Sequence, residues 1–173
     1  MSDPSSAPGQ GNSGQAGSGQ AGSGHANPGG LAVSPIAINA QYVKDLSFEN
    51  PNAPQILAQL REQPSVQVNV DVKARKLADT IYEVVLVIRA EARHGEQTAF
   101  MAEITYGGVF TVSGITDDQL QPLLLIECPR LLFPYARAIL SETVRDGGFP
   151  PLLLQPLDFA EMYRRTPPQA MQA

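Results

Sequence analysis

Few side chains in this sequence could carry out catalysis. Beyond the first 30 residues the chain has one histidine, His94, and its only cysteine is Cys128. His94 falls in a predicted hairpin turn, where an imidazole is normally exposed and has no nucleophile or carboxylate to work with. Cys128 precedes a proline at a predicted helix junction, where a buried and unreactive thiol is expected. Neither residue indicates an active site.

The sequence also lacks the common motifs for binding phosphates, metals and nucleic acids. Gly107 and Gly108 stand alone, without the further residues of a phosphate-binding loop. One cysteine excludes an intramolecular disulfide and a cysteine-based zinc cluster. The net charge is −5 and the pI is about 4.9, whereas duplex nucleic acid requires a basic face. We therefore predict a protein that is not an enzyme, has no cofactor or metal and binds no nucleic acid.

Composition divides the 173 residues into a tail and a body. Nine of the 15 glycines fall within residues 1–30, which contain no lysine, arginine or aromatic residue. This Gly/Ser/Gln-rich stretch cannot bury enough apolar surface to offset the entropy of ordering, so we expect a disordered tail. Residues 31–166 are expected to form a single domain, and residues 167–173 a flexible C-terminal tail.

The location of the protein is expected to be cytoplasmic. No segment approaches the roughly 18 consecutive apolar residues of a membrane helix, so no membrane insertion is expected. The start of the chain lacks the basic and apolar regions of a secretory signal.

Four segments rich in β-formers indicate strands. The last two are joined around Gly95, which can take the positive φ of a hairpin turn. Residues 44–54 contain two prolines and two asparagines, so we expect an irregular connection there, long enough to permit a crossover. Gly107 and Gly108 indicate a bulge or a close approach of backbone. The strands are expected over residues 36–43, 65–73, 80–93 and 97–112.

Alternation also assigns side chains to the two faces of the predicted sheet. Within residues 97–112, Phe100 and Ile104 fall on one face, while Met101 and Glu103 fall on the other. If helices cover the first face, the second carries mixed apolar and acidic groups. Such a face can pack against a second copy, bind a basic partner or be an ordinary solvated surface. Two other strands have apolar faces, formed by Ile36, Ile38, Ala40 and Tyr42 and by Val66, Val68, Val70 and Val72.

The rest of the body is expected to be helical. Thr116 and Gln119 form a capping box that begins the first helix, and Cys128-Pro129 is expected to interrupt the helical segment. Pro134 is expected to kink the second helix or to mark its true first turn. Strands followed by helices predict an α+β fold, a four-stranded antiparallel sheet with helices packed on one face. The helices are expected from residue 116 to 127, from there to 145, and from 158 to 165.

Several long motifs follow one another through the body of the chain. They are residues 47–54 (SFENPNAP), 82–86 (YEVVL), 95–100 (GEQTAF), 107–110 (GGVF), 128–137 (CPRLLFPYAR) and 148–152 (GFPPL). In this order, over about residues 36–165, they resemble the motifs of the bacterial protein-export chaperone family SecB.

The resemblance implies a homotetramer, a dimer of dimers, that holds unfolded precursor proteins without ATP and delivers them to the translocase motor SecA. In that family an acidic sheet surface contacts SecA, and the matching positions are Asp45, Glu49, Met101 and Glu103. Clients of the family bind in long apolar grooves. The positions that match the grooves are Phe48, Ile56, Leu57, Val66, Val68, Val70, Phe159 and Tyr163, of which the valines and Phe159 are equally explained as core.

Two other kinds of protein are compatible with an α+β body of this size. A hot-dog-type thioesterase would need a polar catalytic residue beside an acyl tunnel, and no such residue stands out. A carrier of small apolar ligands would need a closed pocket.

Overall fold

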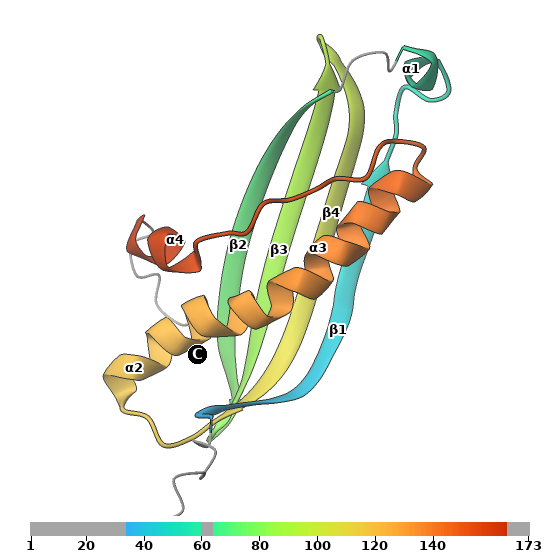
Figure 1. The fold of residues 1–173 in the computed structure, drawn as a ribbon. Coiled ribbons are helices and arrows are strands. Elements are labelled where there is room, and N and C mark those ends of the chain that lie inside the picture. The colour runs from blue at the N-terminus through green and yellow to red at the C-terminus, as the bar shows by residue number, and fades with distance from the viewer. Residues whose placement is uncertain (1–33, 60–63, 166–173) are drawn as a thin grey trace, which may run out of the picture. The chain divides into compact units, whose positions relative to one another are not determined.

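The computed structural model describes residues 34–59 and 64–165, so the expected tails at residues 1–30 and 167–173 lie outside the described residues. Within the described part, four strands form one antiparallel sheet in the order β1-β4-β3-β2 (Figure 1). The strands are β1 (Ile36–Glu49), β2 (Ser65–Ala78), β3 (Ile81–His94) and β4 (Gln97–Val112).

The sheet combines a meander with one crossover. Strands β2, β3 and β4 follow one another as neighbours, and β1 is added beside β4 through the connection that contains α1 (Gln55–Ala58). Gly95 turns the β3–β4 hairpin with a φ of 59°, as predicted. The crossover that the sequence permitted is therefore the observed topology.

The helices complete the predicted α+β class. A continuous helical segment follows β4, and its longest part, α3, crosses the sheet over β3 and β4 (Figure 1). The segment consists of α2 (Asp117–Pro122), the π-helical turn η1 (Leu123–Glu127) and α3 (Cys128–Asp146). An extended stretch then leads back to α4 (Phe159–Arg165).

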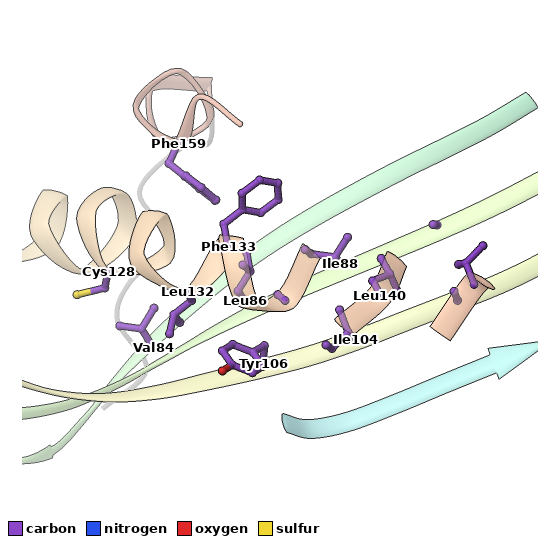
Figure 2. Packing of buried hydrophobic residues seen from close by; sticks show 14 of the residues in the cluster. Val84, Leu86, Ile88, Ile104, Tyr106, Cys128, Leu132, Phe133, Leu140 and Phe159 are labelled. Atoms are coloured by element: carbon purple, nitrogen blue, oxygen red, sulfur yellow. The ribbon is translucent and has the colours of Figure 1, made fainter. Parts of the chain in front are cut away.

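The core lies between α3 and the sheet. Side chains of β3 and β4 such as Leu86 and Ile104 face Leu132 and Leu140 of α3 (Figure 2). All four are completely buried, which is the main stabilising contribution expected for a sheet covered by one long helix.

The first strand is longer than predicted, and its faces differ from the prediction. β1 continues to Glu49 because Pro51 and Pro54, which cannot donate an N–H to a neighbouring strand, come only after it. The expected irregular connection at residues 44–54 was therefore wrong over its first half. Register shifts between Ile38 and Ala40 and again beyond Val43 indicate β-bulges. The first bulge places Tyr42 opposite Gly107 while Ile38 is opposite Phe110, on the other face. The predicted common face of Ile36, Ile38, Ala40 and Tyr42 was therefore also wrong.

The helical segment is not interrupted at Cys128-Pro129, contrary to prediction. The N–H of Cys128 bonds to the carbonyl of Leu123, five residues back, and the chain continues directly into α3. Pro129 has no N–H with which to continue the hydrogen-bond ladder, and the π-helical turn directly before it accommodates the proline by changing the hydrogen-bond register within the continuous segment. Pro134 lies inside α3 and does not mark its first turn. The helix ends where predicted, before Gly147 and Gly148.

Candidate functional site

We call the sheet face turned away from α3 the outer face. On β3 and β4 the even-numbered side chains, such as Leu86 and Ile104, are buried beneath α3. The alternate side chains, including Arg89 and Glu103, therefore lie on the outer face. Phe100 is buried on the helix-covered face and Met101 lies on the outer face, as the alternation predicted.

The structure brings the four positions of the predicted acidic surface together on the outer face. Asp45 of β1 is opposite Thr105 of β4, and Glu49 is opposite Met101. Glu103 lies between these two rows on β4. Met101 is 37% exposed, so a thioether is available beside the carboxylates. We refer to Asp45, Glu49, Met101 and Glu103 as the acidic surface.

Glu103 differs from the other carboxylates of the acidic surface. Arg89 lies directly opposite Glu103 on β3. It donates from Nε to Glu103 Oε2 at 2.6 Å and from Nη2 to Glu103 Oε1 at 3.1 Å. Asp45 and Glu49 form no ion pair with any described residue. Within the described part of the chain, the acidic surface therefore contains two carboxylates without an ion pair and one that is paired with Arg89.

A second polar cluster on the outer face was not predicted. Glu83 of β3 is only 4% exposed, and it accepts hydrogen bonds from the hydroxyl of Tyr42, from Lys44 Nζ at 3.1 Å and from Arg75 Nε at 2.5 Å. Burial alone would raise the pKa of this carboxyl, but the three hydrogen bonds outweigh burial and lower the pKa to about 2. No local sequence pattern indicated this cluster, because its members come from three strands that pair only in the folded sheet.

A close approach occurs at Gly107. A methyl group in place of its hydrogen would lie 2.8 Å from the ring of Tyr42, so only glycine leaves room for the ring. Gly108 is similarly constrained, by Leu132 of α3 at 2.8 Å. The glycines therefore allow a close approach, but side chains make it, not the backbone of another segment as expected. The bulges of the β1–β4 pair lie in β1 and not at the glycines.

Three of the predicted groove positions lie on an exposed apolar strip of the helix-covered face. Val66 and Val68, near the start of β2, are each 39% exposed, and Val70 is half-buried. Val68 lies in one cross-strand row with Phe48 of β1, through Ala90 and Ala102. Phe48 is half-buried against Phe100 and Phe149, and Leu57 of α1 is 38% exposed.

The other predicted groove positions do not join this strip. Ile56 and Phe159 are 0% and 1% exposed and belong to the core, so they offer no surface to a ligand. Phe159 packs its ring edge-on against Phe133 of α3 (Figure 2). Tyr163 is half-buried on α4, which packs against η1, and its hydroxyl donates to Gln121 Oε1 at 3.3 Å. A single chain therefore does not bring the eight positions into one groove.

Two shallow hollows lie between α3 and the extended stretch that follows it. Their volumes are about 400 and 350 Å³. Arg137 borders both hollows; it donates from Nη1 to the carbonyl of Leu154 at 3.3 Å and places its guanidinium over the ring of Phe133. These are depressions in the surface beside α3, and they do not have the form of an acyl tunnel.

Among the residues that the structure describes, Cys128 does not become a catalytic candidate. Burial raises the pKa of the Cys128 thiol to about 12, with a smaller contribution from the charge of Glu127, so the thiol is a poor nucleophile at neutral pH. Within residues 34–59 and 64–165, no three His, Cys, Asp or Glu side chains are grouped so as to hold a metal ion. No helix of that same part of the chain is long and apolar enough to cross a membrane.

Comparisons with known proteins agree on one family. The profile of the family described as "SecB: Preprotein translocase subunit SecB" matches residues 32–170. The chain is 55% identical over 152 residues to "Protein-export protein SecB" of Granulibacter bethesdensis, which covers 83% of this chain and 89% of the relative. It is 56% identical over 132 residues to the protein of the same name from Rhodospirillum centenum, which covers 76% and 79%.

One solved structure has a similar fold at low sequence identity. It is the SecB-like chaperone Rv1957 of Mycobacterium tuberculosis, in complex with a ChAD peptide from the Rv1956 HigA1 antitoxin. The TM-score is 0.60 at 15% identity, and the likeness covers 71% of this chain and 91% of that one.

Proposed function

Because the chain belongs to the SecB family of protein-export chaperones, we propose that it holds secretory precursor proteins unfolded without ATP and delivers them to SecA. The protein acts in the cytoplasm as a homotetramer, a dimer of dimers, and it uses neither a cofactor nor an active site. The observation that carries the proposal is the family match over residues 32–170, with relatives about half identical along most of the chain.

Client holding is supported by exposed apolar side chains near the start of β2. An unfolded chain presents apolar side chains and unpaired backbone groups, and an apolar strip beside an edge strand can accept both without reading a sequence. Val66 and Val68 provide the exposed part of such a strip, and β2 is the last strand of its sheet on that side. Because the chaperone binds only unfolded clients, mass action shifts their folding equilibrium and no nucleotide is required.

Delivery to SecA is supported by the charge of the outer face. The free carboxylates of Asp45 and Glu49 attract a basic partner and speed its encounter. Met101 adds a flexible apolar contact in the middle of the acidic surface. Since the acidic surface and the apolar strip lie on opposite faces of the sheet, SecA can bind while a client is still held.

Assembly is supported by apolar side chains that a single chain leaves uncovered. Val43 and Leu46 of the edge strand β1 are 44% and 42% exposed, and Tyr135 of α3 is 54% exposed. Contact with further copies would bury them. Several copies would also supply several client strips, and the combined weak contacts would give avidity for one long unfolded chain.

The experiment is a refolding assay on a slow-folding secretory precursor, diluted from denaturant with and without this protein and without nucleotide. The proposal predicts that near-stoichiometric amounts arrest refolding. A folded form of the same precursor is the control, and it should not bind. Unchanged refolding would contradict client holding, and saturable binding of a small apolar ligand would then favour a carrier.

A further inference from the structure

We propose that Arg89 competes with the basic partner for Glu103 and thereby limits the affinity of the acidic surface. The inference rests on the proposed contact between this surface and SecA, and it assigns a specificity-determining role to a residue outside that contact. Arg89 acts through Glu103, as an internal substitute for a cation of the partner.

The geometry of the pair is that of a cation binding a carboxylate. Arg89 and Glu103 are directly opposite on β3 and β4, and the guanidinium engages both carboxylate oxygens through Nε and Nη2. A partner's arginine or lysine would seek the same two oxygens. Each oxygen keeps a second lone pair, as Glu83 shows by accepting from Lys44 and Arg75 together. Arg89 therefore does not exclude a partner's cation but competes with it for the two-point geometry.

Arg89 is distinct from the other cations of the outer face. Lys44 and Arg75 both bond to Glu83, which is buried and outside the acidic surface. Arg93 pairs with Glu91, at 2.7 Å from Nε to Oε1. Lys73 pairs with Asp71, at 3.6 Å from Nζ to Oδ2. Among the described residues, only Arg89 forms an ion pair with a carboxylate of the acidic surface.

The pair is exposed enough to exchange. The side chains of Arg89 and Glu103 are 58% and 31% exposed, and ion pairs in such positions are weak because water solvates the separated charges well. An incoming cation can therefore displace Arg89. The displaced guanidinium stays beside the carboxylate and repels the incoming cation, so part of the cost persists in the complex.

The test measures the affinity of purified SecA for the full-length protein at several salt concentrations. Replacing Arg89 by alanine should increase the affinity roughly three- to tenfold at low salt and steepen its decrease with added salt. Arg89→Lys keeps the charge but loses the two-point contact, and it should fall between the alanine variant and the unchanged protein. The matched control is Arg93→Ala, which removes the same charge from the same strand and face but frees Glu91, and it should increase the affinity less.

A double-mutant cycle separates competition from a general change of charge. In the Glu103→Gln background the removal of Arg89 should change the affinity less than twofold. An equal gain in both backgrounds, or an equal gain from Arg89→Ala and Arg93→Ala, would overturn the competition. If the unchanged protein binds SecA and Arg89→Ala binds it with the same affinity, this inference alone is overturned. If no form binds SecA, the proposed SecA contact is overturned and the inference with it.

Discussion

The hydroxyl of Tyr42 on β1 donates a hydrogen bond to the carboxylate of Glu83 on β3, although β4 lies between the two strands. The contact is possible because the ring of Tyr42 lies over Gly107 of β4, where any side chain would collide with it. Arg75 of β2 binds the other oxygen of Glu83. The cluster thus connects all four strands across the outer face, and it fastens the strand that carries Asp45 and Glu49.

Replacing Glu83 by glutamine should destabilise the fold and loosen β1. A neutral amide cannot accept charged hydrogen bonds at both of its terminal atoms, and hydrogen bonds to charged groups are worth about 2 kcal/mol. We expect a loss of about that size in the free energy of unfolding, measured with urea, together with faster amide exchange in β1. The matched control is Glu91→Gln, at an exposed ion pair on the same strand, and it should cost less than about 1 kcal/mol.

The contribution of Glu83 should depend on pH in a defined direction. Burial opposes ionisation, but the hydrogen bonds from Tyr42, Arg75 and Lys44 dominate and lower the pKa from 4.5 to about 2. The unfolded chain therefore takes up a proton more readily than the folded one, so the stabilisation is fully present above pH 4.5 and is lost as the pH falls toward 2. The difference in urea midpoint between the unchanged protein and Glu83→Gln should shrink over this window, and a constant difference would contradict the assignment.

Gly107→Ala should destabilise the protein through Tyr42. The added methyl group would lie 2.8 Å from two ring carbons, which forces the ring out of its position over β4. Overpacking of this kind typically costs about 1–3 kcal/mol, and a urea titration would measure it. Removing the ring by Tyr42→Ser should abolish most of this additional cost. An equal penalty in the presence and absence of the ring would show that another contact is responsible.

Val68→Asp should weaken client holding without unfolding the protein. The side chain is 39% exposed on the apolar strip, so a carboxylate there remains solvated in the free protein but is desolvated by a bound apolar client. We expect the refolding assay to require roughly tenfold more protein for the same arrest, a difference of about 1.4 kcal/mol in binding. Gln67→Glu adds the same charge to the neighbouring residue on the outer face and should leave the arrest unchanged.

Most of the sheet could be predicted because its residues follow simple rules. The valines of β2 alternate strictly, and Gly95 marks the hairpin, so β3, β4 and the start of β2 were located closely. The end of β2 was not, since the strand continues to Ala78 beyond the predicted end at residue 73. β1 was not located closely either, because its two bulges reverse the alternation after Ile38 and the prolines beyond Glu49 were taken to affect the residues before them. The interruption predicted at Pro129 was wrong for a similar reason. Local propensity does not show that a π-helical turn can precede a proline in a continuous helix.

The candidate surfaces were predictable to different degrees. Alternation alone placed Met101 and Glu103 on the outer face, but Asp45 and Glu49 came from the family resemblance, since their segment was expected to be irregular. The cluster at Glu83 depends on contacts between residues 41 positions apart and could not be derived from local pattern. Ile56 and Phe159 were predicted to line a groove but are buried in the core. The sequence alone does not distinguish an apolar residue on a surface from one in the core.

The central claim is that clients and SecA use separate faces of the sheet. The most direct measurement compares the unchanged protein with Glu103→Lys in one assay that follows both arrest of precursor refolding and transfer of the arrested precursor to SecA. A reversed charge in the acidic surface should weaken SecA binding tenfold or more, by roughly 1.4 kcal/mol, and leave the arrest intact. The matched control is Asp79→Lys, a charge reversal in the exposed turn between β2 and β3, far along the sheet from Arg89 and Glu103, which should preserve both activities. Equal loss of arrest and transfer in Glu103→Lys, or transfer as efficient as in the unchanged protein, would contradict the claim.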